Sequence, residues 1–523
     1  MTSMIAEAID GNVKEMTRRT LLGTTLLGTT PFLLRAQRLP PATAVASGDV
    51  THDQALIWAR AAGAASRMVV RWKTSEKGTE RSSSIAAGGA GRDFTSRLLL
   101  RGLPPGQTVL YTVQFEDGKN KSEPVAGRLR TPSRKADRNV RLAWSGDVAG
   151  QGYGINPEWG GMKGFEAVRA IEPDFFIHSG DTVYADGAIP KEIVLPNGRG
   201  VWKNLVTPEK SKPAETLDEF RGAYRYNLLD EHVRRHLADV PQIWQWDDHE
   251  VMNNWSPGME VPARYTERDI RVIAARARQA FGEYAPIPFG PEGNIFRVVP
   301  YGPLVDVFVL DMRSFRAGNT YNRQEQAGPD TALLGDGQIA WFLKALKESK
   351  AVWKVIACDM PIGLIVGDGK DAQGRARYEA VANGNGPVLG REFEIARILR
   401  FLKEQRIRNT VWLTADVHYT AAHHYSPERA HAGFREFDPF WEFVSGPLNA
   451  GTFGPGELDN TFGPEVVFAK HPPKGQSNLP PSAGYQFFGD ITVDSRTKAL
   501  RVVLRDIAGT ALYTKELEAA TGA

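Results

Sequence analysis

Six short apolar segments spread over residues 140–419 each end in an aspartate or a histidine. Helical patterns lie between several of them, at residues 164–171, 336–349 and 391–405. Strands that are apolar on both faces and alternate with helices are typical of an α/β layered domain. Ligands of such domains bind beyond the carboxyl ends of the strands, so acids far apart in the sequence can converge on one rim. The segments are VRLAWSGD (140–147), DFFIHSGD (174–181), QIWQWDDHE (242–250), VDVFVLDMRS (305–314), VWKVIACDMP (352–361) and TVWLTADVHY (410–419).

Residues 40–132 have the pattern of an all-β domain. Short segments rich in aromatic and β-branched residues are separated by Gly, Pro or Asp-Gly turns, as in strands joined by tight turns. A turn followed by a tyrosine-bearing strand, at residues 102–113, is typical of immunoglobulin-like and fibronectin-like sandwiches. We therefore expect a β-sandwich at 40–132, a polar linker at 131–139 and a catalytic domain at 138–523. The expected strands are ALIWAR (55–60), RMVVRWKT (67–74), SRLLLRGLPPG (96–106), TVLYTVQFEDG (108–118) and AGRLRTP (126–132), with further hairpin strands at 485–517.

The N-terminus carries a pair of arginines. Arg18 and Arg19 precede a mildly apolar run of leucines and small residues that ends near residue 34. This arrangement is typical of a twin-arginine export signal. It predicts a signal segment at 1–39, passage through the twin-arginine translocase, and a periplasmic or extracellular location. The alternative is the start of a cytoplasmic amphipathic helix. The run is too short for a bilayer and no stretch of twenty apolar residues occurs elsewhere, so we expect no membrane span.

Charge and cysteine content narrow the function classes. The 523-residue chain has a formal net charge of only +3, so we expect no nucleic acid as a structural partner. Cys358 is the single cysteine, which excludes an intramolecular disulfide in a protein predicted to be exported. The length predicts two or more domains, and we expect a monomer.

The acids and histidines at the strand ends predict a metal site. A single strand-end aspartate often does no more than cap a loop or a helix, and we keep that interpretation for Asp311 and Asp359. Carboxylates interleaved with imidazoles form a set that capping does not explain. Hard oxygen ligands suit Ca²⁺, Mg²⁺, Mn²⁺ and Fe³⁺, and imidazoles add zinc or iron. The acids outnumber the ligands of one catalytic zinc, so we expect more than one metal. The set is Asp147, Asp181, Asp247, Asp248, His249, Asp416 and His418.

Several motifs carry a family resemblance. GDTVY (180–184) is similar to the GDxxY motif of iron-containing metallophosphoesterases, DDHE (247–250) stands where that superfamily has an Asn-His pair, and ADVHY (415–419) stands among its late histidine motifs. Together with the twin-arginine pattern, they make the chain resemble the alkaline phosphatase D (PhoD-type) family. The resemblance implies an α/β (α+β layered) metallophosphoesterase sandwich behind an N-terminal all-β domain. It also rests on VASGDV (45–50), HSGDTVYADG (178–187), WDDHEVMNNW (246–255), LDMRSFR (310–316), TADVHYTAA (414–422) and FVSGPLNAG (443–451).

The resemblance also implies a role for each site residue. Asp181 bridges two metals, and Tyr184 binds iron as a phenolate. Asp416 binds on the calcium side and His418 on the iron side. Asp248 stands at the position of the superfamily's asparagine ligand, and His249 at the position of its catalytic histidine. Asn253 and Asn254 are implied to lie near the metals or to contact a metal through water. The implied cofactors are Ca²⁺ with Fe³⁺.

Asp147 marks a departure from the family. Members often have a cysteine ligand after the first α/β strand, and Asp147 stands at that position in WSGD (144–147). Exchanging a thiolate for a carboxylate hardens the site. It leaves Fe³⁺ compatible and makes Mn²⁺, Mg²⁺, Zn²⁺ or an all-calcium site better suited than in a typical member. Cys358, at another strand end, is expected to be a buried structural residue.

Other candidates each have two interpretations. Arg313 and Arg316 suit bidentate contact with a substrate phosphate, or an ion pair that fixes a loop. His424 either enters the site or lies at the surface, while His178 is expected to be a core residue. The glycine-rich stretch 146–154 suggests either a backbone-lined phosphate contact or a flexible lid.

These features predict an exported metal-dependent phosphoester hydrolase, an alkaline phosphatase or phosphodiesterase, that acts on small phosphate esters. A metal-bound hydroxide is the expected nucleophile, with His249, Asp248 and Arg313 as catalytic residues. No serine or cysteine nucleophile beside a base is evident. One alternative is a phospholipase D-like hydrolase of lipid headgroups. The other is an extracellular binding protein with a vestigial metal site.

Overall fold

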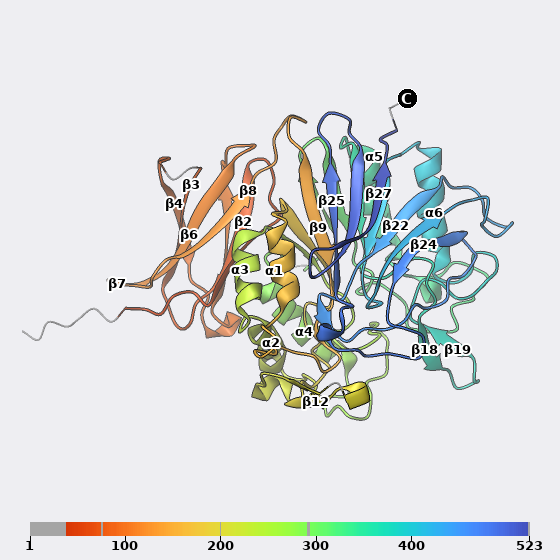
Figure 1. Cartoon of the computed structure of the whole chain (residues 1–523), viewed down its shortest axis with the longest axis horizontal. Helices are drawn as coiled ribbons and strands as arrows, with labels where there is room; N and C mark the ends of the chain where they lie inside the picture. The colour runs from red at the N-terminus through yellow and green to blue at the C-terminus, as the bar shows by residue number, and fades with distance from the viewer. Residues whose placement is uncertain (1–37, 75–76, 199, 290–292, 521–523) are drawn as a thin grey trace, which may run out of the picture. The chain divides into compact units, whose positions relative to one another are not determined.

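Two facing sheets with helices on both outer faces form most of the structure (Figure 1). This computed structural model describes residues 38–74, 77–198, 200–289 and 293–520, so nearly all of the predicted signal segment 1–39 lies outside the described residues. Within the described part, no helix is long and apolar enough to cross a membrane.

The first sheet has nine strands in the order β27-β26-β25-β9-β11-β14-β1-β2-β5. Its centre is parallel: β11 lies between β9 and β14 and runs parallel to both. Parallel pairing places the carboxyl ends of these strands at one edge. The strands are β1 (Ala44–Gly48), β2 (Gln54–Arg60), β5 (Thr95–Arg101), β9 (Val140–Ser145), β11 (Phe175–Ser179), β14 (Gln242–Gln245), β25 (Phe487–Val493), β26 (Leu500–Asp506) and β27 (Ala511–Leu517).

The second sheet has seven strands in the order β15-β16-β17-β20-β22-β21-β24. Here β16, β17, β20 and β22 are parallel neighbours. The strands are β15 (Arg297–Tyr301), β16 (Val305–Val309), β17 (Trp353–Ala357), β20 (Thr410–Thr414), β21 (Thr420–Tyr425), β22 (Phe440–Val444) and β24 (Pro464–Lys470).

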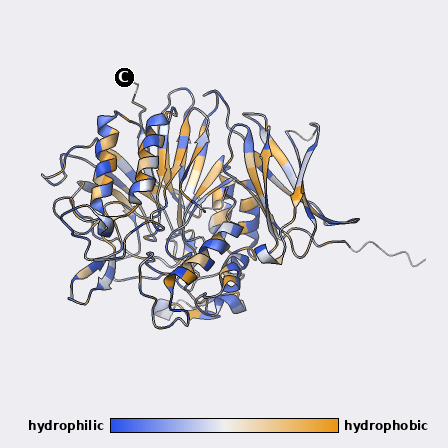
Figure 2. Ribbon diagram, turned by 180° about the vertical axis from the view of Figure 1, so that it is seen from behind, coloured by the Kyte–Doolittle hydropathy of each residue, from blue (hydrophilic) through white to orange (hydrophobic). Residues whose placement is uncertain are grey.

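Alternating side chains divide the core into layers. In β11, Phe175 and Ile177 pack between the two sheets, whereas Phe176 packs under the helices. All three are buried, which explains why the segment reads as a continuous apolar run. The order is therefore helices, sheet, sheet, helices, and Figure 2 shows hydrophobic residues concentrated on the strands.

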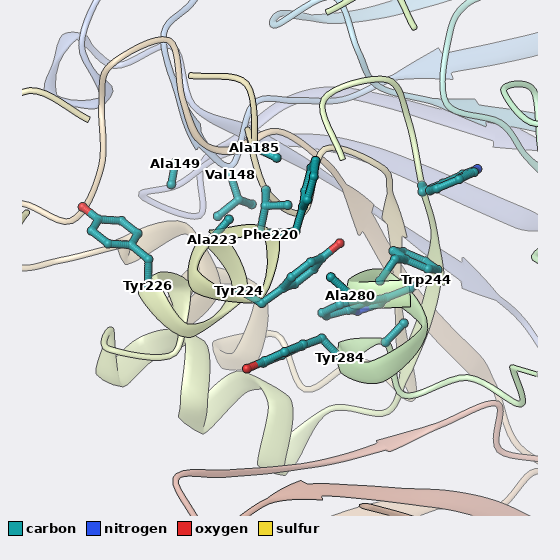
Figure 3. Close-up of a cluster of buried hydrophobic side chains, with 14 of the residues drawn as sticks. Val148, Ala149, Ala185, Phe220, Ala223, Tyr224, Tyr226, Trp244, Ala280 and Tyr284 are labelled. Carbon is teal, nitrogen blue, oxygen red and sulfur yellow. The ribbon is translucent and has the colours of Figure 1, made fainter. Parts of the chain in front are cut away.

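Within residues 38–520, apart from the gaps named above, six α-helices cover the sheets. α2 begins at a capping box, in which the Thr216 side chain accepts from the Glu219 N–H. Figure 3 shows the cluster under α2 and α4, where the Tyr224 and Tyr284 rings stack 5.0 Å apart near Trp244. The helices are α1 (Lys163–Ala170), α2 (Leu217–Asn227), α3 (Glu231–Asp239) and α4 (Ile270–Tyr284) on the nine-stranded sheet, and α5 (Gly335–Glu348) and α6 (Glu392–Glu404) on the seven-stranded sheet.

The N-terminal part is a β-sandwich whose one layer joins the nine-stranded sheet. β1 pairs in parallel with β14 through Gly48 and Gln242, and the Trp58 indole donates to the Glu283 carbonyl over 2.8 Å. The opposite layer consists of β3 (Arg67–Lys73), β4 (Arg81–Ala86), β6 (Thr108–Asp117), β7 (Asn120–Lys121) and β8 (Val125–Arg130). Short pairs complete the fold: β10 (Val148–Gly150) with β23 (Asn449–Ala450), β12 (Glu192–Val194) with β13 (Val201–Lys203), and β18 (Gly367–Lys370) with β19 (Ala376–Tyr378).

The predicted fold class is confirmed, with one addition. The six predicted apolar segments are β9, β11, β14, β16, β17 and β20, and the three predicted helices are α1, α5 and α6. The strands belong to two sheets, three in each. Both sets carry their polar residues at their carboxyl ends, and the next section describes where those residues meet.

Candidate metal centre

In the part of the chain that the structure describes, three overlapping groups of acids and histidines lie at the carboxyl ends of β9, β11, β14 and β20. In each group the candidate ligand atoms lie within 4.8 Å of one another. Asp181 belongs to two of the groups and Asp248 to two. The groups are Asp147, Asp181 and His418; Asp181, Asp248 and His249; and Asp247, Asp248 and Asp416. The two sheets therefore bring together residues that lie up to 271 positions apart, from 147 to 418.

The loops that carry these ligands use left-handed backbone. Four of the residues have a positive φ: Asp147 (64°), Asp181 (49°), Asp416 (66°) and His418 (58°). This conformation is costly for residues other than glycine, and it clusters at functional sites. Gly180, with φ of 95°, also allows close approach, because a Cβ there would lie 2.4 Å from the Cβ of Asp247.

Several buried carboxylate oxygens of the site lack hydrogen-bond partners. Among the described residues, neither carboxylate oxygen of Asp147 has a partner, nor does Oδ2 of Asp181 or Oδ1 of Asp248. Burial, reinforced by neighbouring acids, raises the pKa of Asp147 to about 8 and that of Asp181 well above its usual value. Burial also raises the pKa of Asp416. Buried, unpaired carboxylates of this kind fit hard cations, which supply the missing positive charge.

Tyr184 and His418 face each other at the first group. The Tyr184 hydroxyl lies 2.6 Å from Nε2 of His418. Nδ1 of His418 contacts the Gly451 carbonyl, which can only accept, so Nδ1 carries the proton and Nε2 presents a lone pair. Burial lowers the pKa of His418 to about 4, which keeps the imidazole neutral. The pair thus offers a phenol oxygen and an imidazole nitrogen beside Asp147.

His249 is oriented by an acid that the sequence reasoning did not identify. Its Nδ1 lies 2.7 Å from Oδ1 of Asp186, and its ring packs 4.1 Å from the ring of Tyr184. Burial acts to lower the pKa of His249, but Asp186 and the nearby acids raise it well above its usual value. Asp186 follows Tyr184 by two residues, and its place in the same loop is the sequence feature that could have pointed to a role in the site.

Glu250 was also missed, and it ties two ligand loops together. Its carboxylate accepts hydrogen bonds from the N–H groups of Asp181 (3.1 Å), Thr182 (2.6 Å) and Asp247 (2.8 Å). The last residue of the DDHE motif therefore holds the loop after β11 against the loop after β14.

Arg313 does not have the contacts of a phosphate-binding residue. Its side chain has no exposed surface, and Nε lies 2.5 Å from Asp247 and 3.2 Å from Asp359. Glu379 pairs with both Arg313 and Arg316. These contacts match the ion-pair interpretation, because the guanidinium lies behind the ligand loops and supports Asp247.

The remaining candidates lie outside the three groups. His424 lies near the C-terminal end of β21, where its Nδ1 is 3.2 Å from a guanidinium nitrogen of Arg429. His178 is a buried core residue whose ring packs against Phe176 and Trp244. Cys358 is buried, as expected. Asp311 and Asp359 accept hydrogen bonds from nearby backbone N–H groups, as capping residues do.

The glycine-rich stretch 146–154 is part of the packed site. Val148–Gly150 is buried and paired with β23, which does not suit a flexible lid. A Cβ on Gly150 would lie 2.4 Å from the ring of Tyr184. Of the two predicted asparagines, Asn254 donates its N–H to the Asp248 carboxylate and Asn253 donates its N–H to Asp186 over 3.0 Å.

Comparisons with known proteins agree with this architecture. Alkaline phosphatase D of Bacillus subtilis (strain 168) is 27% identical over 402 residues, which cover 72% of this chain and 64% of that protein. The chain thus spans less than two thirds of the length of this relative. A solved structure described as "Structure of PhoD" superposes with a TM-score of 0.66 at 19% identity, over 92% of each chain, and so shares the fold. Residues 30–133 match the N-terminal domain of PhoD-like phosphatases, and residues 142–504 match the PhoD-like phosphatase itself. The chain belongs to the PhoD-like phosphatase family.

Proposed function

We propose that this protein is a metal-dependent phosphoester hydrolase of the alkaline phosphatase or phosphodiesterase kind. The observation that carries the proposal is that Asp181 is shared between two groups of ligand atoms, with His249 beside it. An acid shared by two cations is the arrangement that clamps both oxygens of a phosphoryl displacement. The family membership and the named relative support the same activity.

The donor set supports one hard trivalent and one divalent ion. Asp147, His418 and the Tyr184 oxygen would hold the first, which we assign to Fe³⁺ because a phenolate favours a hard trivalent ion. Asp248 and Asp416 would hold the second, which we assign to Ca²⁺, and Asp181 would serve both. Since Asp147 is a carboxylate, Mn²⁺, Mg²⁺ or Zn²⁺ also suits the first position. When bound, the cations supply charge neutralisation and an activated water at the phosphorus.

The chain's own residues orient the ester and move the proton. Asp186 holds Nδ1 of His249, so Nε2 faces the cleft lined by Asp181, Asp248 and His418. The imidazolium can donate from Nε2 to a phosphoryl oxygen or to the departing oxygen. Arg313 keeps Asp247 in place from behind and is a positioning residue rather than a catalytic one.

Export, localisation and domain roles complete the proposal. The Arg18-Arg19 motif supports a twin-arginine route to the periplasm or the exterior, and residues 40–132 and 138–523 are proposed as the β-sandwich and catalytic domains. We further propose a monomer that acts on small phosphate esters. A phospholipase D-like activity on lipid headgroups is the second candidate, since the same metal-assisted displacement would cleave a phosphodiester. The vestigial binding protein predicts lost ligands, whereas every predicted ligand residue is present, with the acids and His418 in overlapping groups and Tyr184 beside His418.

Hydrolysis by purified, metal-loaded protein tests the proposal. We expect turnover of p-nitrophenyl phosphate, of its bis ester, or of both, and loss of at least 10³-fold in kcat/KM for Asp181→Asn, roughly the scale of a lost electrostatic stabiliser. Asp336→Asn is the matched control, since that side chain is 99% exposed. Turnover of phosphatidylcholine vesicles alone would favour the second candidate. Hydrolysis that persists in Asp181→Asn and His249→Ala would overturn the mechanism.

A further inference from the structure

His249 lines two adjoining clefts. The first contains the side chains of the proposed metal ligands Asp181, Asp248 and Asp416. The second has a volume of about 950 Å³ and includes Tyr184 and Asp186. Gln151, His249 and Asn253 line both clefts. The proposed function places proton donation to the departing oxygen at Nε2 of His249, in the first cleft. Because the two clefts adjoin at His249, the rest of the leaving group can extend into the second cleft.

Three arginines from two separate segments line this second cleft. Arg264 and Arg268 come from the loop before α4, and Arg377 comes from β19. Each arginine already has a contact within the protein. Arg264 lies 3.7 Å from Asp186, Arg268 donates to the Pro262 carbonyl, and Arg377 donates to the Asp368 carbonyl. A guanidinium has five donor N–H groups, so each arginine keeps donors for a ligand.

The cleft also contains acids, but the charge that faces solvent is mostly positive. The side chain of Arg264 is 56% exposed, while that of its neighbour Asp186 is 6% exposed and already held by His249. Arg377 is 39% exposed and Asp368 23%, and Asp368 also accepts from Asn254 and Asn319. Glu260, the third acid, is exposed, as is Arg268.

We propose that this cleft is a subsite for an oxyanion on the leaving group of the substrate, either a carboxylate or a second phosphate. The inference rests on the proposed function and narrows its substrate class: the ester carries a second negative charge several bonds from the scissile phosphorus. Guanidinium groups bind carboxylate and phosphate oxygens bidentately, and both oxyanions share that geometry. A phospholipase D-like reaction on phosphatidylcholine releases choline, and three arginines do not suit this cationic leaving group, so the second candidate is disfavoured.

Three aryl esters with related leaving groups test the subsite. Phenyl phosphate has a neutral leaving group, 3-carboxyphenyl phosphate has a carboxylate, and hydroquinone bisphosphate has a second phosphate. We expect kcat/KM for one or both anionic esters to exceed that for phenyl phosphate by about tenfold at low salt, the equivalent of one charge-assisted hydrogen bond. The preference should shrink between 0.05 and 0.5 M salt, since screening weakens exposed charge pairs. The ester that is preferred distinguishes the two oxyanions.

Charge-neutral variants locate the effect. Arg264→Gln and Arg377→Gln should each lower the ratio of anionic to neutral kcat/KM several-fold. Arg271→Gln is the matched control: this arginine is 84% exposed, lies near the start of α4 and does not line the cleft. A wild-type ratio at or below one, or an equal ratio in wild type and both cleft variants, would overturn the subsite.

Binding of the free leaving group separates failure of the subsite from failure of the proposed function. By calorimetry, 3-hydroxybenzoate or the non-hydrolysable 4-hydroxyphenylphosphonate should bind the wild-type protein and bind each cleft variant several-fold more weakly, independently of turnover because neither has a phosphoester bond. If none of the three esters is hydrolysed, the proposed function fails, and the calorimetric result then decides on the subsite by itself. Absence of binding to the wild type would overturn it.

Discussion

Asp186 holds Nδ1 of His249 at 2.7 Å while its other oxygen accepts the Asn253 N–H at 3.0 Å. The carboxylate is thus fixed on both oxygens, and the imidazole has one orientation. A histidine that must place a proton on a departing oxygen benefits from such restraint.

Replacing Asp186 by Asn should lower kcat by about 10²-fold with little change in KM, because the imidazole loses both its orientation and its charge partner. Steady-state kinetics with p-nitrophenyl phosphate measures kcat and KM separately. Asp186→Glu should recover part of kcat, and a variant whose only change is a higher KM would contradict the positioning role.

Tyr184→Phe should remove the phenol oxygen that lies 2.6 Å from His418 while keeping the ring that packs on His249. If the first position holds Fe³⁺, wild-type protein is coloured by a phenolate-to-iron transition and the variant is not. The visible spectrum, recorded beside elemental analysis, measures this. A colourless, active wild type that contains only calcium, manganese or zinc would show that the iron assignment is wrong.

Glu250→Gln should destabilise the protein by about 2–4 kcal/mol, because an amide replaces a buried acceptor of three backbone N–H groups. The loss should be greater in metal-free protein than in metal-loaded protein, since bound cations also hold these loops together. Thermal unfolding with and without chelator measures both values. Equal stability of variant and wild type would exclude the tying role of Glu250.

The sequence was sufficient for elements whose signal is local. β11 is a continuous apolar run that ends in Ser-Gly-Asp, and both its burial and the position of Asp181 follow from that pattern. α3 was missed because its residues are mostly polar and only Val233, His236 and Leu237 are buried. The sequence did not identify Asp186 and Glu250 as site residues, because their roles depend on contacts with His249 and Asp181, which lie 63 and 69 residues away, respectively. Arg313 matched a phosphate-binding pattern, but burial among acids is a tertiary property that a sequence motif does not encode.

Acidification should destabilise the fold through two buried histidines. Burial lowers the pKa of His178 and of His236 to about 3, and His236 lies among the rings of Phe165 and Phe176. In the unfolded chain both titrate near 6.5, so their contribution to stability is complete above that pH and falls as the pH decreases towards 3. At pH 5 the loss is about 2 kcal/mol for each histidine.

Unfolding free energies measured from pH 8 to pH 4.5 test this, with His236→Phe as the informative variant. The variant should show a shallower pH dependence than wild type. His52→Phe is a suitable control, because that side chain is 39% exposed. If His236→Phe and wild type lose stability in parallel, the acid sensitivity comes from other groups.

Gly150→Ala should weaken metal binding although Gly150 is not itself a ligand. A Cβ at this position would lie 2.4 Å from the ring of Tyr184, which is itself held between Gly150, His249 and His418. The ring must move, and overpacking of this kind costs about 1–3 kcal/mol. Because the Tyr184 oxygen moves with the ring, we expect lower occupancy of the first cation position by elemental analysis. Gly337→Ala is the control, since no atom lies within 4 Å of its added Cβ and alanine favours its helix. Unchanged metal content in Gly150→Ala would show that the tyrosine does not depend on this close approach.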